Sequence, residues 1–284
     1  MTIIETMLEK TKARAPTGTA IPHGIHTHPR RSDMPAPHTS IEARRLAIDP
    51  VAARENRLLL GMEQKDRGAM AAYGMLRTRL LHRARAKGWT TIAVTSASPQ
   101  DGKSLTALNL SLSLARERNS SVVLLDCDLC NPSVCHLLGI APPVELREYF
   151  QQKSRAPGEL FVSIGIDNLL IAGNTAPTEQ SAELLGSSRL EELLEFIKRS
   201  TVNPLILIDL PPIVSPDDAL VVAPRVDALL IVASQEITSR AELQKALDLA
   251  SHFPLAGLVM NRAIGVRGKY TYGYGYGAAP MPRG

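Results

Sequence analysis

The sequence predicts a doubly wound α/β fold with a mostly parallel sheet, and three observations support this prediction. Short runs of β-branched and other apolar residues recur between positions 90 and 261, and stretches with helical spacing of apolar residues separate them. Ala97 to Ser104 has the pattern of a phosphate-binding loop between one such run and a helix-forming stretch. Near-continuous apolar runs are typical of strands that helices cover on both faces.

The N-terminal part, residues 1–66, is expected to lie outside the main domain. Residues 2–14 place apolar side chains at helical spacing between charges, which predicts a short amphipathic helix that is either a plain surface helix or a docking helix for a partner. Residues 15–40 are rich in Pro, Thr and His and have few large apolar side chains, so we interpret them as a linker without a metal site. A connecting helix is expected between the linker and residue 67.

The main domain is expected at 67–262. Its predicted strands are 90–96, 121–127, 205–210, 227–233 and 255–261, and its clearest predicted helices are 105–117, 188–199 and 239–251.

Composition limits the class of protein. The 284 residues carry a formal net charge of +4 with a pI of about 9.0, too diffuse along the chain to indicate a nucleic-acid partner. No apolar run approaches the roughly 18 residues that a membrane span needs. A secretory signal is also missing, so we expect a cytoplasmic protein.

The phosphate-binding pattern depends on Gly102, Lys103 and Ser104. Backbone N–H groups that lead into a helix N-terminus can cradle phosphate oxygens, the lysine adds a mobile charge, and the serine offers a hydroxyl to Mg²⁺. Ala97 and Gln100 occupy positions where glycine is usual or common in such loops. The strand before the pattern and the helix after it nevertheless favour nucleotide binding.

Three aspartates are predicted to gather beside this loop. Asp126 and Asp128 close the strand at 121–127, where the alternation of side chains directs both carboxylates to one side and Cys127 to the other. Asp209 closes the strand at 205–210. Carboxylates at the carboxyl ends of parallel strands suit magnesium binding and general-base catalysis.

The three cysteines, Cys127, Cys130 and Cys135, lie near His136 with a spacing that allows a metal or redox site. Because Cys127 is expected in a buried strand and the other two around a turn, we interpret all three as thiols in a reducing compartment.

Four of the six tyrosines lie in the C-terminal segment at 263–284, at positions Tyr270, Tyr272, Tyr274 and Tyr276. In an extended chain they would share one face, and no apolar surface opposes them. Two interpretations remain open: a set of phosphoacceptors, or a low-complexity end that associates nonspecifically.

Together, these motifs resemble the bacterial tyrosine kinases of exopolysaccharide and capsule assembly. The resemblance rests on "SPQDGKS", "LLDCDL", "LILIDLPP", "AELLGSSRLEELL", "GLVMNR" and the terminal tyrosines, and covers about residues 67–276. The "MTIIETMLEK" start and the proline-rich linker are similar to the soluble autokinases of exosortase-associated exopolysaccharide loci.

The resemblance implies a P-loop NTPase fold of the deviant Walker type and an ATP-dependent tyrosine autokinase. It implies Lys103, Asp126 and Asp128 as catalytic residues, and Ser104, Asp128 and Asp209 as Mg²⁺ ligands. It implies an ATP or ADP site at Ser98, Pro99, Gln100, Asp101, Gly102, Lys103, Ser104, Leu105, Asn261 and Arg262.

The resemblance also implies partners. These are a membrane polysaccharide co-polymerase that recruits and activates the kinase at the inner face of the membrane, a cognate tyrosine phosphatase, and further copies of the chain in a homo-oligomer. The family's ring-assembly segment has an acid and an arginine where this chain has Ala71 and Gly74, although Arg77 is kept. The chain also has Cys130 where an arginine is common.

Two other functions stay open at this point. One is a partitioning or cell-division ATPase of the related deviant Walker type, whose signature lysine would stand where this chain has Ser98. The other is an adaptor that senses nucleotide without effective catalysis, which Gln100 and Cys130 keep open.

Overall fold

The computed structural model describes residues 40–62, 66–117, 119–215, 218–235 and 237–263, all of which belong to one unit, Ala36–Gly284. The expected helix at 2–14, the linker up to residue 39, and the four tyrosines of the C-terminal segment lie outside these residues.

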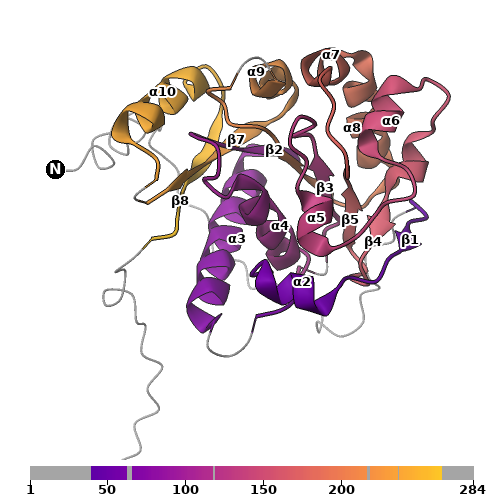
Figure 1. Ribbon diagram of the computed structural model, residues 1–284, viewed down its shortest axis with the longest axis horizontal. Coiled ribbons are helices and arrows are strands. Elements are labelled where there is room, and N and C mark those ends of the chain that lie inside the picture. Colours follow the sequence, from indigo (N-terminus) through magenta and orange to yellow (C-terminus); the bar gives the residue numbers. More distant parts are fainter. Residues whose placement is uncertain (1–39, 63–65, 118, 216–217, 236, 264–284) are drawn as a thin grey trace, which may run out of the picture. The chain divides into compact units, whose positions relative to one another are not determined.

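One sheet runs through the described part of the chain, with the strand order β1-β4-β5-β3-β6-β2-β7-β8 (Figure 1). All neighbouring strands are parallel except β4 and β5, which pair in antiparallel fashion. The strands are β1 (Arg44–Arg45), β2 (Thr91–Ser96), β3 (Val122–Asp126), β4 (Val162–Ser163), β5 (Leu169–Ala172), β6 (Leu205–Asp209), β7 (Ala228–Ser234) and β8 (Leu255–Asn261).

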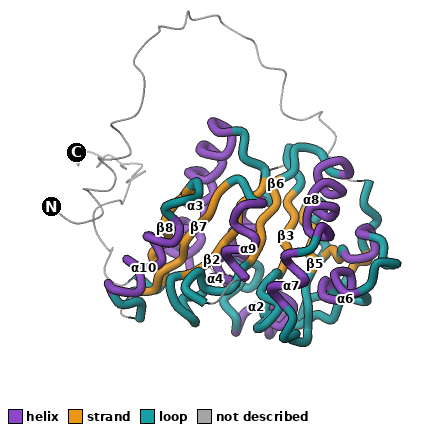
Figure 2. The backbone as a smooth tube through the Cα atoms, turned by 90° about the horizontal axis from the view of Figure 1, so that it is seen from above, coloured by secondary structure: helices purple, strands orange, loops and turns teal. Residues whose placement is uncertain are grey.

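Helices cover both faces of this sheet (Figure 2). They are α2 (Pro50–Glu55), α3 (Arg67–Lys87), α4 (Lys103–Leu114), α5 (Val134–Leu138), α6 (Leu146–Gln151), α7 (Ser181–Gly186), α8 (Ser188–Ser200), α9 (Asp218–Val222) and α10 (Arg240–Ala250), with two short 3₁₀ helices at Pro157–Leu160 and Ala223–Arg225. Among the described residues, we find no helix with the length and apolar character needed to cross a bilayer.

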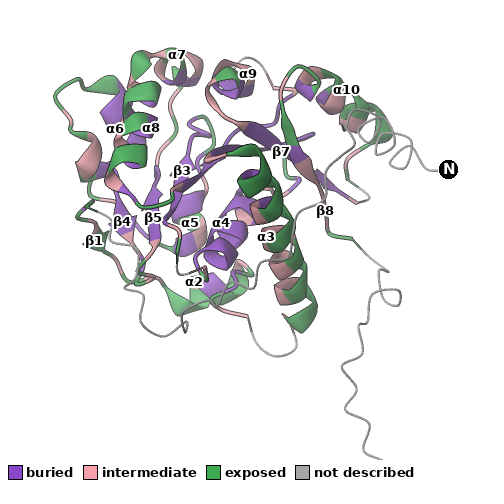
Figure 3. Ribbon diagram, turned by 180° about the vertical axis from the view of Figure 1, so that it is seen from behind, coloured by how far each residue is buried: buried purple, intermediate pink, exposed green. Residues whose placement is uncertain are grey.

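The alternation of side chains along each central strand builds one core on each face of the sheet. In β6, Ile206 and Ile208 pack with residues of α6 to α10, whereas Leu205 and Leu207 pack with residues of α2 to α5. Figure 3 shows the central strands and α4 as buried and much of α3 as exposed. Because the central strands are buried on both faces, their sequences are nearly continuous runs of apolar residues.

The fold agrees with the predicted doubly wound α/β class. All five predicted strands are present within one residue of their expected starts, and the helix expected at 105–117 starts earlier, at Lys103, because Gly102 ends the phosphate loop. The sequence did not predict β1, β4 and β5. The first two have two residues each, and β5 has four, so none is long enough for a clear periodic signal.

The strand register places the candidate site at the carboxyl edge of the sheet. Asp126 at the end of β3 is the register partner of Asp209 at the end of β6, and Asp209 is also the partner of Val94 in β2. The strand β2 ends at Ser96, two residues beyond Val94, and the phosphate loop follows directly. In open parallel sheets this is the edge where ligands bind.

Candidate active site

The phosphate loop joins the end of β2 to the start of α4 and has two residues in left-handed conformation. Gly102 has φ 87°, a backbone angle that favours glycine, and a Cβ atom added there would displace the side chain of Asn261. Gln100 has φ 64°, which is uncommon for a residue with a side chain. The glycine that is common at position 100 would relieve this conformation, so Gln100 keeps the loop shape at a cost in backbone strain.

Lys103 joins the loop to two of the three aspartates. Its Nζ lies 2.6 Å from Asp128 Oδ2 and 3.7 Å from Asp209 Oδ2, and it donates a hydrogen bond of 3.0 Å to Ser104 Oγ. Burial lowers the pKa of Lys103, but attraction to Asp209 and Asp128 outweighs burial, so the net pKa lies above its ordinary value. The lysine is therefore a cation held among acids at the helix N-terminus.

Asp209 is a fully buried carboxylate with unused binding capacity. Among the described residues, neither of its oxygens has a hydrogen-bond partner, and its ion-pair partner Lys103 has its Nζ 3.7 Å from Oδ2. Burial raises the pKa of Asp209 to about 6, although Lys103 and Ser104 oppose the shift. Buried carboxylate oxygens are almost always paired, so an orphaned carboxylate beside Ser104 fits a site that receives a cation.

A cation at this position would have few protein ligands. Among the described residues, no three His, Cys, Asp or Glu side chains form a ready group of metal ligands. Mg²⁺ commonly binds through one or two carboxylates, with phosphate and water oxygens completing its shell. Ser104 and Asp209 fit that donor set.

Asp126 is held differently from its two neighbours. Its Oδ2 accepts hydrogen bonds from the backbone N–H groups of Ser133 and Val134, at 3.0 and 2.9 Å, while the buried Oδ1 has no partner. Burial raises the pKa of Asp126 to about 8, and repulsion from Asp209 adds to the effect. Asp126 thus combines a fixed orientation with one free, basic oxygen.

Asp128 lies just past the end of β3 and is almost fully buried. One carboxylate oxygen faces Lys103, and the other accepts the backbone N–H of Asn131 at 3.1 Å. Cys127 packs into the core on the opposite face from this cluster, as the alternation predicted.

The other residues that the sequence predicts for a nucleotide site differ in their exposure. Ser98 and Asp101 are buried within it, whereas Pro99 and Gln100 are exposed, and Leu105 packs partly against the core. Asn261 Nδ2 donates to the Asp101 carbonyl at 2.8 Å, and Arg262 is exposed with φ 53°. Eight of the ten residues thus belong to the loop and the first turn of α4, and Asn261 contacts the loop through the backbone of Asp101.

Two residues near the site were missed by the sequence interpretation. Asn174, fully buried after β5, donates to the Asp126 carbonyl at 3.0 Å and accepts the Arg147 N–H at 2.7 Å. Thr238 donates to Asp101 Oδ1 at 2.6 Å. Both are polar residues in loops that follow strands, a position too common to identify them without the fold.

The cysteines are dispersed. Cys127 and Cys135 are buried, while Cys130 is exposed with its Sγ 3.6 Å from Asp218 Oδ2. Partial desolvation and the nearby Asp218 raise the pKa of Cys130, so its thiol is less prone to ionise than an ordinary cysteine.

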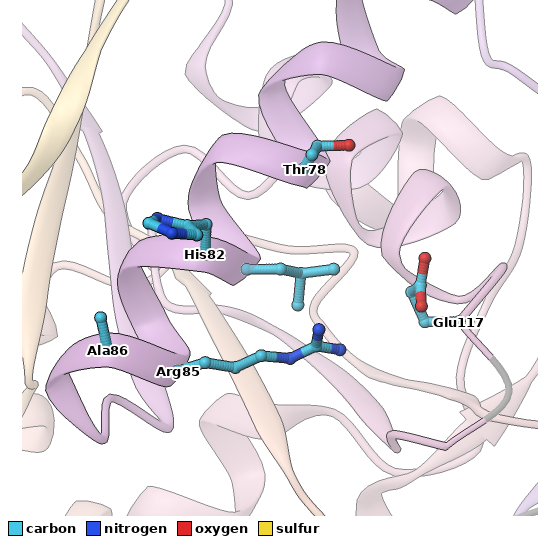
Figure 4. Close-up of a pocket in the computed structure, with 6 residues that line it drawn as sticks. Thr78, His82, Arg85, Ala86 and Glu117 are labelled. Carbon is cyan, nitrogen blue, oxygen red and sulfur yellow. The ribbon is translucent and has the colours of Figure 1, made fainter. Parts of the chain in front are cut away.

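A cavity of about 530 Å³ lies elsewhere, along α3 (Figure 4). Thr78, His82, Arg85 and Ala86 line it from α3, with Leu81 from the same helix and Glu117 from beyond the end of α4. No residue of the phosphate loop contributes to it.

Comparison with known proteins places this geometry in a family. A family model described as ParA, NUBPL iron-transfer P-loop NTPase, matches residues 89–271, well over half of the chain. The tyrosine-protein kinase YwqD of Bacillus subtilis is 25% identical over 217 residues, which cover 74% of this chain and 87% of that protein. The tyrosine-protein kinase Wzc of Salmonella typhimurium is 28% identical over 72% of this chain, but the match covers only 29% of its own length.

Solved structures agree with these relatives. The VpsO kinase domain superposes with a TM-score of 0.61 at 26% identity, covering 70% of this chain and 98% of that domain. A ParA family ATPase from Chlorobium tepidum, with a TM-score of 0.51 at 21% identity and 61% coverage of this chain and 74% of its own, shares the fold alone. The resemblance to bacterial tyrosine kinases is thus confirmed, and the chain belongs to the ParA family of P-loop NTPases, which bind nucleotides.

Proposed function

We propose that the chain is an ATP-dependent protein-tyrosine kinase that regulates exopolysaccharide synthesis and phosphorylates tyrosines of its own C-terminal segment. The observation that carries this proposal is the buried cluster of Lys103, Asp126, Asp128 and Asp209 at the phosphate loop. Relatives named tyrosine-protein kinases support the choice of reaction.

In this proposal the loop and Lys103 position the phosphates of ATP. The backbone N–H groups at the start of α4 bind phosphate oxygens, and Lys103, which Asp128 holds beside the loop, contacts the phosphoryl group that is transferred. The phenol oxygen of a tyrosine forms a bond to the γ-phosphorus while the bond from that phosphorus to the bridging oxygen breaks, and ADP leaves.

Asp126 is the better candidate for the proton acceptor. The phenol loses its proton during transfer, and Asp126 in its ionised form, with a free oxygen and a raised pKa, can take that proton up. Asp128 then supports Lys103 and the metal, because its two oxygens already face Lys103 and Asn131.

The residues proposed to hold Mg²⁺ are Ser104 and Asp209, with support from Asp128. Mg²⁺ in such a site would neutralise charge that develops on the phosphate oxygens. The orphaned oxygens of Asp209 are the basis for this assignment.

The proposal extends to partners and location. A membrane polysaccharide co-polymerase would recruit the cytoplasmic chain to the inner face of the membrane and activate it, and a tyrosine phosphatase would reverse the modification. The chain spans only 25% to 30% of the length of several curated relatives. A homo-oligomer is also proposed, although Ala71 and Gly74 leave its usual contact segment incomplete.

A second candidate is a nucleotide-hydrolysing switch that transfers no phosphate to protein. The match to the ParA family model favours it. Ser98 counts against it, because this residue stands where such ATPases carry their signature lysine, and its backbone N–H is bound to Asp101 Oδ2 at 2.8 Å.

The test incubates the full chain with γ-labelled ATP and Mg²⁺ and compares wild type with Asp209→Asn. Asparagine keeps the shape but removes the charge, so we expect label on tyrosine to fall at least ~100-fold. Asp248→Asn, on the exposed face of α10, is the matched control and should behave as wild type. Release of inorganic phosphate without labelled protein would support the switch instead, and unchanged labelling in D209N would exclude this site.

A further inference from the structure

Asp101 is a carboxylate inside the phosphate loop that solvent does not reach. Its exposed fraction is 0%, and its two oxygens have different partners. Oδ2 accepts the backbone N–H of Ser98 at 2.8 Å, across the turn of the loop. Oδ1 accepts the hydroxyl of Thr238 at 2.6 Å, from a segment 137 positions away in the sequence.

The direction of the second bond is set by a third group. Thr238 Oγ1 accepts the backbone N–H of Ser234 at 2.7 Å, which occupies one of its lone pairs and leaves its single proton for Asp101. The chain of bonds therefore runs from the end of β7, through Thr238, into the loop. Because the acceptor of the last bond is a carboxylate, this bond is a charge-assisted hydrogen bond, which is stronger than a bond between two neutral groups.

The loop is held to the neighbouring strand as well. Asn261, the register partner of Ser234, donates from its Nδ2 to the carbonyl of Asp101 at 2.8 Å. Asp101 is thus tied to the ends of both strands that lie beyond β2 in the sheet, by its side chain to β7 and by its backbone to β8.

We infer that Thr238 is a positioning residue for nucleotide binding, which acts through Asp101 to hold the phosphate loop in the shape that the phosphates require. The backbone N–H groups that bind phosphate must all point to one centre, and Asp101 immediately precedes Gly102 and Lys103 among them. The bond from Thr238 fixes the rotation of the Asp101 side chain. The bond from the Ser98 N–H to the same side chain then fixes the conformation of the loop between Ser98 and Asp101. This inference deepens the proposed function and rests on its nucleotide site.

Removal of the hydroxyl would have two local effects. Asp101 Oδ1 would become a buried charged oxygen with no partner, and the N–H of Ser234 would lose its acceptor. The loop would relieve the first defect by turning Asp101 toward water, which breaks the Ser98 bond. Thr238→Val makes this change at nearly constant shape, and Thr238→Ser keeps the hydroxyl.

The experiment measures ADP affinity of the full chain by calorimetry with Mg²⁺, and KM and kcat for ATP. For T238V we expect ADP binding about tenfold weaker or more, with KM for ATP raised by a similar factor and kcat changed less. T238S should bind within about threefold of wild type. Thr78→Val, at an exposed position of α3 whose hydroxyl bonds only its own helix at the Gly74 carbonyl, is the matched control.

Asp101→Ala removes the acceptor of the same bond from the side of the loop. If the bond acts as inferred, D101A weakens ADP binding, and the double variant D101A/T238V is no weaker than the worse single variant. This comparison also covers a T238V protein that melts at a lower temperature, because affinity is measured well below that temperature. Equal ADP affinity of T238V and wild type, or strictly additive losses, would overturn the inference. Wild type that binds ADP but labels no tyrosine would refute the proposed kinase and leave this inference standing.

Discussion

At the scale of single residues, the site brings together buried acidic side chains that contacts within the fold stabilise only in part. Asp126 and Asp209 face each other at the ends of two paired strands, with one lysine to share between them and Asp128. Acidic groups whose pKa values are shifted by removal from water are characteristic of functional sites, where ligand binding or catalysis uses the shifted pKa. The raised pKa values of Asp126 and Asp209 are its measurable sign.

We predict that these two acids make the nucleotide-free protein less stable as the pH rises. A carboxyl whose pKa is raised by folding contributes stability that is complete below its unfolded pKa, about 4, and is lost as the pH passes through its folded value. For Asp209 that value is about 6 and for Asp126 about 8, so the loss extends from about pH 4 to pH 8. Asp126→Asn stays neutral throughout and should reduce the slope.

Urea unfolding of wild type and D126N between pH 5 and 9 is the measurement. We expect the urea midpoint of D126N, relative to that of wild type, to rise with pH up to about pH 8 and to level off above it. Asparagine can still accept the N–H groups of Ser133 and Val134, so the comparison isolates the charge. If the difference between the urea midpoints of D126N and wild type were the same at all pH values, Asp126 would not be desolvated as described.

At the scale of elements, the sequence predicted the central strands and the edge strand β8, but not the strands at the other edge. The strands β2, β3, β6 and β7 are apolar runs of five to seven residues that burial on both faces makes recognisable, whereas β8 is a partly exposed run of seven residues. The short strands β1, β4 and β5 lie together at one side of the sheet and depend on pairing with neighbours. The 21-residue helix α3 buries only Leu80 and Ala84 completely, so its apolar pattern is weak.

The candidate site was predictable to a similar extent. Lys103, Ser104 and the three aspartates belong to motifs that each follow a recognisable strand, and parallel pairing brings the strand ends together. Thr238 and Asn174 follow β7 and β5, and they contact the loop and the Asp126 carbonyl only because the strands are ordered as they are. Strand order is a tertiary property that the local sequence does not encode.

Helix α8 provides a prediction for a whole element. Its apolar residues Leu190, Leu193, Leu194 and Ile197 recur at helical spacing and are buried, far from the phosphate loop in sequence and on the other core from α4. Leu193→Ala should lower the free energy of unfolding by about 2–5 kcal/mol, because it leaves a cavity in the core. ADP affinity of the folded fraction should be unchanged.

The matched control is Glu195→Ala on the exposed face of α8, where the ion pair with Lys198 at 3.6 Å is solvated. It should change stability by less than about 1 kcal/mol. Denaturant titration measures both variants. A loss of ADP affinity in L193A at a temperature where it is folded would mean that α8 communicates with the site, contrary to this expectation.

At the scale of the whole molecule, the order of strands connects the site to the end of the chain. β8 lies at the edge of the sheet next to β7, and its last residue, Asn261, contacts the phosphate loop. The described chain ends at Ala263, so the C-terminal segment starts at the candidate site. The seven residues from there to Tyr270 can span at most about 25 Å, enough to reach this site or that of a neighbouring copy.

Charge suggests what phosphorylation of the four tyrosines would do. From Gly265 onward the segment contains Arg267, Lys269 and Arg283 and no acidic residue, a side-chain charge of +3. Each phosphate adds about −1.5 to −2, so two phosphates would roughly cancel this charge and four would reverse it. A contact that depends on the positive segment would then be released.

A fourfold variant tests whether the C-terminal tyrosines are the phosphoacceptors. In it, phenylalanine replaces Tyr270, Tyr272, Tyr274 and Tyr276. This change keeps the aromatic surface and removes only the hydroxyl groups, so phosphotyrosine on the chain should fall to a few per cent of the wild-type level while ADP affinity stays the same. The other two tyrosines are poor acceptors, because Tyr149 is buried with its hydroxyl bonded to the Arg189 carbonyl, and burial raises the pKa of Tyr73. Tyr73→Phe is therefore the matched control and should label as wild type does. Quantitative mass spectrometry of the phosphopeptides is the measurement. If the fourfold variant were labelled as strongly as wild type, the kinase would act on other tyrosines, and the C-terminal cluster would need another explanation.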